Sequence, residues 1–155
     1  MKTLITYFSA TNTTKSVAEK IAAEIKGDLF EIVPQQKYTE EDLNWNDKLS
    51  RSSKEMEDKT SRPKILNKIE NLENYDKVII GFPVWWYLPP RIINTFIEEN
   101  DLRGKKIYIF VTSGGSSSEG SFNALKEEYK DLEFISCKRF TGNEPTNTYN
   151  DWIND

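Results

Sequence analysis

The amino-acid sequence predicts an α/β fold in which helices cover both faces of a parallel, doubly wound sheet. Short apolar runs rich in β-branched and aromatic residues alternate along the chain with segments whose apolar residues recur at helical spacing. Several of these runs are apolar at consecutive positions, which is typical of strands covered on both faces. Because 155 residues is an ordinary length for one domain, we expect a single three-layer α/β/α domain over residues 1–155.

Five apolar runs are predicted to form the strands, over residues 3–8, 29–33, 77–82, 106–112 and 132–137. The first run follows a lysine, as the apolar part of a signal peptide does, but it is too short for that role and no small-residue cleavage site follows it. We therefore interpret it as a strand. No stretch approaches the ~20 apolar residues of a membrane span, and we expect a cytoplasmic protein that does not enter a membrane.

Helical spacing of apolar residues predicts four further elements. The first helix carries its apolar residues over 17–25 and ends at Gly27, a residue that commonly terminates helices. The second begins after Pro89-Pro90, since proline suits the first turn of a helix. The third is marked by apolar residues over 122–129, and a short helix is expected over 148–154.

Residues 34–69 fit this alternation least well because they are mostly polar. We expect one helix there, from about residue 40 to residue 58, with Thr39 as its N-terminal cap. The sequence leaves open how this segment packs on the sheet.

The composition excludes several classes of site. The chain has no histidine, and Cys137 is its only cysteine. Ser-His-Asp and Cys-His nucleophiles are therefore ruled out, together with nearly all zinc and iron–sulfur sites, and no metal ligand is predicted. The net charge is −4 and the 21 basic residues are scattered among the 25 acidic ones, so we expect no nucleic-acid partner.

The loop after the first predicted strand is rich in hydroxyl groups and leads directly into a helix. It consists of Ser9, Ala10, Thr11, Asn12, Thr13 and Thr14. Backbone N–H groups at a helix N-terminus bind phosphate without a lysine, and Asn12 tolerates the left-handed conformation of a tight turn. Simple helix capping is the alternative, although one hydroxyl would suffice for it. Because the loop lacks the Gly-Lys-Ser/Thr ending typical of nucleoside triphosphate sites, we predict that it binds a monophosphate.

Two further loops are predicted to lie at the same rim, since ligands of open α/β sheets bind beyond the carboxyl ends of the strands. The sequence FPVWWYLPP (residues 82–90) offers Trp85, Trp86 and Tyr87 as flat faces for a ring. Core or interface packing is the alternative for each of these aromatics, and we expect Trp86 to point inward. The sequence TSGGSSSEG (residues 112–120) has glycines that let backbone N–H groups approach a ligand, with a merely flexible loop as the alternative. Together the loops predict a ligand with a phosphate at one end and a planar heteroaromatic ring at the other.

These motifs resemble those of the flavodoxins, with YFSATNTTKSVAEKI as the phosphate loop, GFPVWWYLPP as the flavin-ring loop and VTSGGSSSEG as the third loop. The middle loop is similar to that of a bacterial flavodoxin-like group with a Pro-x-Trp-Trp sequence. The resemblance covers most of the chain and implies a five-stranded sheet in the order 2-1-3-4-5 with noncovalently bound FMN. It implies that residues 9–14 hold the phosphate. The residues implied to flank the flavin ring are Pro83, Val84, Trp85, Trp86 and Tyr87 on one side and Ser113, Gly114, Gly115 and Ser116 on the other.

Two residues depart from the pattern of this family. Asn12 stands where the family usually has glycine, and because asparagine tolerates positive φ we expect the loop to keep its shape. Tyr87 stands where this group commonly has glycine, and we expect tyrosine to disfavour a positive φ there. In flavodoxins a peptide beside the flavin can flip when the flavin is reduced, and we expect Tyr87 to disfavour that flip.

The resemblance implies an electron carrier that serves redox partner proteins, a reductase and an electron acceptor, as a monomer or weak dimer. An NAD(P)H-dependent FMN or quinone reductase on the same fold is the alternative. The acidic residues Glu98, Glu99 and Asp101 are candidates for facing a basic partner, with solvated helix ends as the competing interpretation. A signalling receiver domain is set aside, because Ser9-Ala10 and Pro83 stand where it needs acidic residues. A degenerate fold that binds no flavin is disfavoured by the three intact loops.

Overall fold

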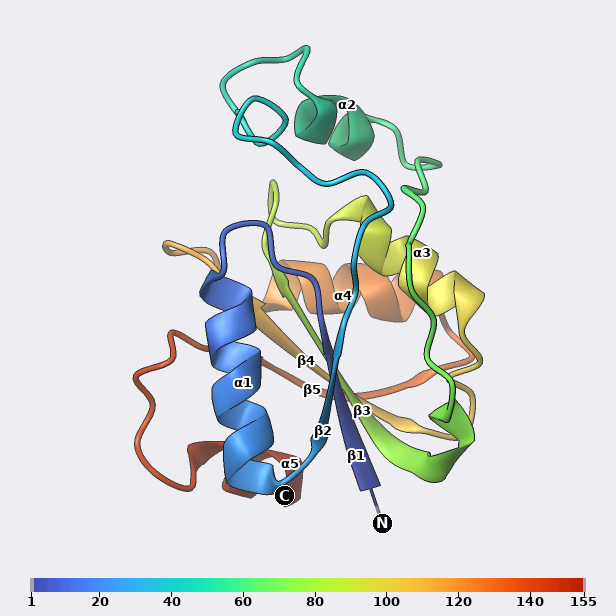
Figure 1. Cartoon of the computed structure of the whole chain (residues 1–155), viewed down its shortest axis with the longest axis vertical. Coiled ribbons are helices and arrows are strands. Elements are labelled where there is room, and N and C mark those ends of the chain that lie inside the picture. The colour runs from blue at the N-terminus through green and yellow to red at the C-terminus, as the bar shows by residue number, and fades with distance from the viewer. Residues whose placement is uncertain (1, 155) are drawn as a thin grey trace.

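The structure is a computed structural model that describes residues 2–154 (Figure 1). Its five strands form one parallel sheet in the order β2-β1-β3-β4-β5, which confirms the predicted fold class and strand order. The end residues of the predicted domain, Met1 and Asp155, lie outside the described residues. The strands are β1 (Lys2–Tyr7), β2 (Asp28–Glu31), β3 (Tyr75–Pro83), β4 (Lys106–Thr112) and β5 (Glu133–Arg139).

The central strand β3 shows why consecutive apolar residues become strands in this chain. Val78, Ile79 and Ile80 are completely buried. Because successive side chains of a strand point to opposite faces, Val78 and Ile80 enter one core cluster whereas Ile79 enters the other. A strand with a core on each face has no position for a polar side chain along this stretch.

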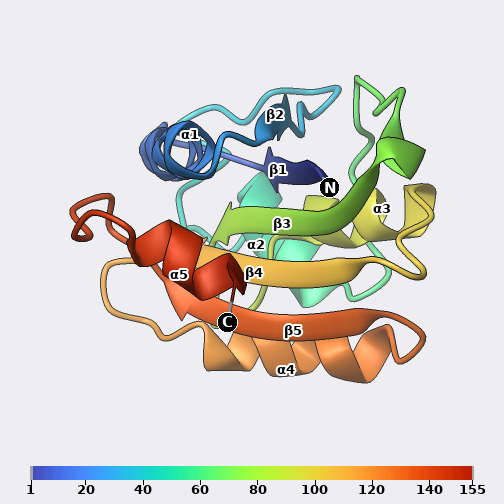
Figure 2. The ribbon, with the colours of Figure 1, turned by 90° about the horizontal axis from the view of Figure 1, so that it is seen from below.

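Helices cover both faces of the sheet (Figure 2). On one face lie α1 (Thr13–Ile25) and α5 (Thr148–Asn154), and on the other lie α3 (Arg91–Glu99) and α4 (Glu119–Glu128). A short 3₁₀-helix, η1 (Leu72–Asn74), precedes β3. None of the helices within residues 2–154 has both the length and the apolar character that crossing a membrane requires.

The prediction of one long helix over residues 40–58 is wrong. Thr39 does cap a turn, because its Oγ1 accepts from the N–H of Asp42 at 3.1 Å and its own N–H donates to Asp42 Oδ2 at 2.9 Å. The helix does not continue, since the side chains of Asn44 and Asp47 accept from backbone N–H groups two residues further on. Such local bonds give the backbone an alternative to the helix.

The helix that does form in this segment is α2 (Arg51–Glu57), which is shorter and starts later. Ser50 is its N-cap, and the Ser50 side chain accepts from the N–H of Ser53. In Figure 1, α2 lies above the sheet, beyond the carboxyl ends of the strands, instead of packing on a sheet face.

The connection from β2 to β3 passes through α2 above the sheet and then returns along the sheet as a non-helical chain. Residues 63–71, which we name the strap, come after α2 and lead to η1. Ile65 forms an isolated antiparallel bridge with Pro34, just after β2. The strap covers the edge of the face on which α3 packs, because Ile65 and Ile69 join the same core cluster as α3.

Candidate functional site

Three loops meet at one rim of the molecule. They follow β1, β3 and β4, and parallel strands bring their carboxyl ends to the same edge of a sheet. In Figure 1 they lie at the upper end of the sheet, facing α2. The rim is thus bounded by the three predicted loops and, from above, by the segment around α2.

The loop between β1 and α1 presents unused backbone donors. Asn12 has a φ of 69°, so the left-handed conformation expected of this residue is confirmed. Its carbonyl accepts the first helical bond from Ser16 at 3.0 Å. Within residues 2–154, the N–H groups of residues 10–14 donate to no acceptor. Since these donors lie at the N-terminus of α1, they form the kind of site that binds an anion.

Two of the hydroxyl groups in this loop have structural partners. Ser9 Oγ accepts from the N–H of Lys15 at 3.2 Å. Thr14 is buried, and its Oγ1 lies 2.7 Å from Oγ1 of Thr112, so this bond ties the loop to the end of β4. Thr11 and Thr13 are exposed and keep their hydroxyl groups available to a ligand.

The loop after β3 is a tight hairpin built on aromatic residues. Trp85 and Leu88 exchange two backbone hydrogen bonds, of 2.9 and 3.0 Å. Trp86 and Tyr87 occupy the two central positions with φ values of 49° and 66°, as a type I′ turn requires. The expectation that Tyr87 disfavours positive φ is therefore wrong: the type I′ turn that closes this two-residue hairpin has positive φ at both central positions.

The inward-pointing aromatic of this loop is Trp85, so the expectation for Trp86 is also wrong. Trp85 makes edge-to-face contacts with Phe8 and Tyr38, with ring centroids 5.8 and 5.4 Å apart. Trp86 is 43% exposed and Tyr87 is 73% exposed. Strand alternation does not continue past the end of β3: Val84 and Trp85 both pack against the core cluster that contains Phe82, and the hairpin turns Trp86 outward.

The loop after β4 is braced from its neighbours. Ser113 Oγ donates to the carbonyl oxygen of Ser116 at 2.6 Å, and Arg139 at the end of β5 donates to both Oγ and the carbonyl oxygen of Ser113. Gly114 and Gly115 face open space, since a Cβ on either would meet no atom within 4 Å. Backbone approach by a ligand is therefore unobstructed at these two residues.

Gly120, at the start of α4 (Glu119–Glu128), has a role that the sequence did not reveal. A Cβ at Gly120 would lie 2.9 Å from the carbonyl oxygen of Tyr87. The neighbouring Ser121 donates from its hydroxyl to the same oxygen at 3.3 Å. The start of α4 thus fixes the peptide that follows Tyr87.

The loops enclose a pocket of about 500 Å³, a size typical of small-molecule sites. Seven predicted residues line it: Ala10, Thr11, Pro83, Val84, Trp85, Trp86 and Tyr87, with Ser116 as an eighth from the third loop. The other predicted residues are in the same loops but outside the lining: Ser9, Asn12, Thr13, Thr14, Ser113, Gly114 and Gly115. The structure therefore brings one part of each predicted loop to a common cavity.

Leu43, Trp45 and Ser52 complete the lining, and the sequence prediction missed all three. They come from the segment around α2, whose role was left open. The only available signal was the presence of a leucine and a tryptophan, Leu43 and Trp45, in an otherwise polar stretch. Trp45 is 70% exposed, so core packing does not explain why a tryptophan stands at this position.

A polar network holds this segment against Trp85. Tyr38 donates from its hydroxyl to Glu55 at 2.5 Å, and the Arg51 guanidinium bonds Glu55 at 2.8 Å. The same guanidinium lies 3.8 Å from the centroid of the Tyr38 ring. Burial, followed by the bond to Glu55, raises the pKa of the Tyr38 hydroxyl, which keeps it protonated as a donor.

The acidic residues considered for a basic partner lie at the other end of the molecule. Glu98 and Glu99 end α3, which runs from the carboxyl end of β3 toward the amino end of β4. Glu98 is engaged by Arg62 at 3.0 Å and by the Tyr129 hydroxyl at 2.5 Å. Asp101 pairs with Arg103 at 2.9 Å. Two of these three carboxylates therefore have partners within the chain.

Comparison with known proteins gives one family and several related structures. The family model described as Flavodoxin matches residues 2–155. A protein from Bacteroides eggerthii assigned as a flavoprotein is 48% identical, with 99% of this chain and 96% of that chain covered and a TM-score of 0.95. One from Bacteroides uniformis, also assigned as a flavoprotein, is 44% identical, with 99% and 98% covered and a TM-score of 0.93.

A third structure shares less sequence but contains a ligand. The flavoprotein from Lactobacillus acidophilus in complex with FMN is 27% identical, with 99% of each chain covered and a TM-score of 0.80. No curated protein matches the sequence.

Proposed function

Since the chain belongs to the flavodoxin family, we propose that it binds FMN noncovalently at the rim pocket and carries electrons between redox partner proteins, a reductase and an electron acceptor. The Lactobacillus acidophilus relative, whose structure contains FMN, supports the choice of cofactor.

The single observation that carries the proposal is the placement of unused N–H donors beside an aromatic pocket. The N–H groups of residues 10–14 have no acceptor within residues 2–154, and Ala10 and Thr11 also line the cavity that contains Trp85 and Trp86. A phosphate satisfies the donors and a flat ring fills the cavity. The residues present therefore fit both ends of FMN.

In this proposal each loop has one task. Residues 9–14 hold the phosphate through backbone N–H groups and the hydroxyl groups of Thr11 and Thr13, residues 83–87 flank the ring, and residues 113–116 close its other side. Trp85, fixed between Phe8 and Tyr38, gives the ring a rigid wall. Leu43, Trp45 and Ser52 shield the pocket from water.

FMN supplies the redox chemistry when it is bound, and the chain supplies position and environment. This division of labour agrees with a sequence that has no histidine and one cysteine. A monomer or weak dimer in the cytoplasm is part of the proposal, and the single cysteine of the chain, Cys137, fits a reducing compartment.

The test identifies the cofactor of the purified protein and follows the reduction of that cofactor. We expect mass spectrometry of the released cofactor to identify FMN, and we expect anaerobic NADPH alone to leave the flavin absorbance unchanged until an NADPH-dependent flavodoxin reductase is added. Rapid bleaching by NADPH alone would instead indicate an NAD(P)H-dependent FMN or quinone reductase. Purification with no flavin, and no binding of added FMN, would contradict the proposal entirely.

A further inference from the structure

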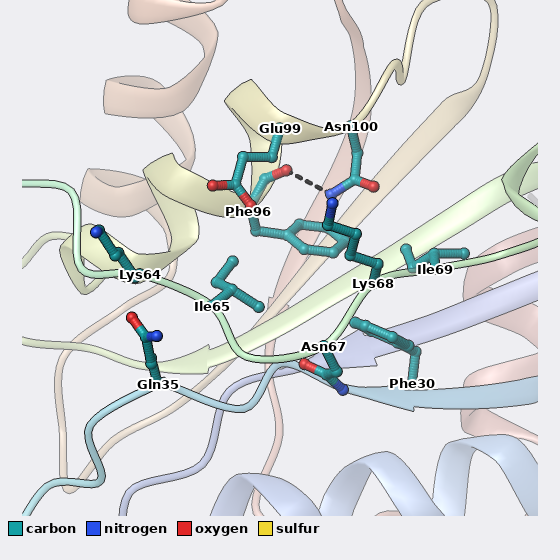
Figure 3. A pocket seen from close by; sticks show the side chains of 10 residues that line it. All are labelled: Phe30, Gln35, Lys64, Ile65, Asn67, Lys68, Ile69, Phe96, Glu99 and Asn100. Atoms are coloured by element: carbon teal, nitrogen blue, oxygen red, sulfur yellow. Dashed lines mark hydrogen bonds between the residues drawn. The ribbon is translucent and has the colours of Figure 1, made fainter.

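A second cavity lies away from the rim pocket, between the strap and α3 (Figure 3). Its volume is about 520 Å³, and it shares no lining residue with the rim pocket. Phe30 of β2 and Phe96 of α3 form part of its floor, with ring centroids 6.2 Å apart. Ile65 and Ile69 of the strap complete the apolar surface.

The cavity exists because the β2–β3 connection has no helix on the sheet. A helix with its side chains is ~10 Å across, whereas the strap is a single non-helical chain and covers less of the sheet face. Phe30 therefore remains partly exposed, although Phe96 beside it is 1% exposed. An apolar ligand in the cavity would remove from water the apolar surface that a crossover helix would otherwise cover, which favours binding.

The strap is fixed in place, so the cavity is formed before any ligand arrives. The Asn67 side chain accepts from the N–H of Val33 at 3.2 Å and donates to the carbonyl oxygen of Glu31 at 2.7 Å. Backbone bonds of 2.8 Å join Gln35 to Lys64 and Leu66 to Val33. These four bonds oppose collapse of the strap onto Phe30 and Phe96.

The charged groups around the cavity favour an anion. Lys64 and Lys68 are exposed, and neither forms an ion pair among the described residues. Figure 3 shows both lysines on the strap, with Lys64 at one end of the cavity and the side chain of Lys68 extending toward the end of α3, where Glu99 and Asn100 lie. Among residues 2–154, Glu99 is the one acidic residue that lines the cavity, so the lining carries two positive charges and one negative charge.

We propose that this cavity binds a small carboxylate with an apolar or aromatic body. The body lies on the floor formed by Phe30, Phe96 and Ile65, and the carboxylate meets the ammonium groups of Lys64 and Lys68 at the rim of the cavity. The site is independent of FMN, since it has no residue in common with the rim pocket.

The test is a titration of the isotope-labelled full chain, as purified, with 3-phenylpropionate, followed by amide NMR shifts. We expect saturable shifts at Ile65, Lys68 and Asn100 and none at Trp86 or Ser116. The uncharged analogue 3-phenylpropionamide is the control and should bind more weakly. No saturable shifts, equal binding of the amide, or shifts at Trp86 and Ser116 instead would each overturn the proposal. None of these results depends on whether the chain binds FMN.

Charge variants sharpen the test. Lys64→Gln and Lys68→Gln should each weaken binding of 3-phenylpropionate by roughly twofold to fivefold, the range of an exposed ion pair. Glu99→Gln should tighten binding, because it removes the opposing charge. Lys130→Gln, an exposed lysine outside the cavity lining, is the matched control and should leave binding unchanged. Weaker binding of 3-phenylpropionate by Glu99→Gln would contradict the proposed arrangement of charges and would overturn the carboxylate assignment.

Discussion

Three of the five non-glycine residues with positive φ within residues 2–154 lie at the rim of this protein. Asn12, Trp86 and Tyr87 all have positive φ and all belong to loops around the pocket. Such a conformation costs an L-residue about 1–2 kcal/mol, and asparagine tolerates it better than an aromatic residue does. The hairpin therefore keeps two large aromatic side chains at the pocket at a cost in stability.

This cost can be measured at Tyr87. Tyr87→Gly should be roughly 0.5–1 kcal/mol more stable to urea than Tyr87→Ala. Glycine relieves the left-handed strain that alanine retains, and this gain exceeds the cost of the larger conformational entropy that glycine gives the unfolded chain. Both variants lose the same exposed ring, so the comparison isolates the backbone. If the alanine variant is the more stable of the two, the left-handed assignment of residue 87 is wrong.

Gly120 allows a second test at the scale of single residues. Gly120→Ala should weaken FMN binding, because the new Cβ would lie 2.9 Å from the carbonyl oxygen of Tyr87 and displace that peptide. A fluorescence titration with FMN measures the change.

Asn123→Ala is the control, since Asn123 is exposed on the same helix and alanine raises helix propensity there as well. Its FMN affinity should be unchanged. Equal affinities of the two variants would contradict the role given to Gly120.

At the scale of elements, α2 depends on a buried arginine. Arg91, the first residue of α3, is 7% exposed and donates to the carbonyl oxygens of Glu55 and Met56 at 3.3 and 2.8 Å. These carbonyls belong to the last turn of α2, where a positive charge is favourable. Arg91 thus ties the segment that covers the rim pocket to the start of α3.

Replacing this arginine should loosen α2. Arg91→Met keeps most of the aliphatic stem but removes both hydrogen bonds, and we expect a loss of about 1–3 kcal/mol in urea unfolding. Arg103→Met, whose exposed partner is Asp101, is the matched control and should cost little. An Arg91→Met variant as stable as the control would contradict the anchoring role.

The contact between Arg62 and the end of α3 should depend on pH. The hydrogen bond from Arg62 holds the pKa of Glu98 below its ordinary value of 4.5. Because the folded-state pKa is the lower one, this stabilisation is present above pH 4.5 and is lost as the pH falls below that value. Glu98→Gln should therefore reduce the pH dependence of unfolding in acid, and an unchanged acid profile would count against the pairing.

Strands were easier to predict than the segment around α2, for a physical reason. The run Val78–Ile80 is buried on both faces, so burial alone makes its pattern unambiguous. In residues 39–50 the turns are set by single side-chain bonds of Asp42, Asn44 and Asp47. The spacing of apolar residues does not indicate which of these local hydrogen bonds forms.

The candidate site shows the same limit. Trp85, Trp86 and Tyr87 were correctly placed at one rim, because the end of a predicted strand fixes where its loop emerges. The directions in which their side chains point could not be predicted, since the type I′ turn arises from the pairing of Trp85 with Leu88. Leu43 and Trp45 could not be assigned, because they reach the pocket through tertiary packing.

At the scale of the whole molecule, three aromatic rings join separate parts of the chain beneath the pocket. Phe8 follows β1, Trp85 follows β3 and Tyr38 belongs to the segment that leads to α2, and the rings contact one another pairwise with centroids 5.4–5.8 Å apart. The proposed phosphate loop and the proposed ring wall are thereby held at a fixed separation. This arrangement suits one ligand that reaches both ends.

The most direct test compares two flavins that differ by one phosphate. The apoprotein is titrated with FMN and with riboflavin, and flavin fluorescence reports binding. We expect FMN to bind at least roughly a hundredfold more tightly, since two charge-assisted hydrogen bonds from the residue 10–14 N–H groups contribute about 3 kcal/mol. Equal affinities for FMN and riboflavin would show that the α1 N-terminus holds no phosphate and would contradict the account.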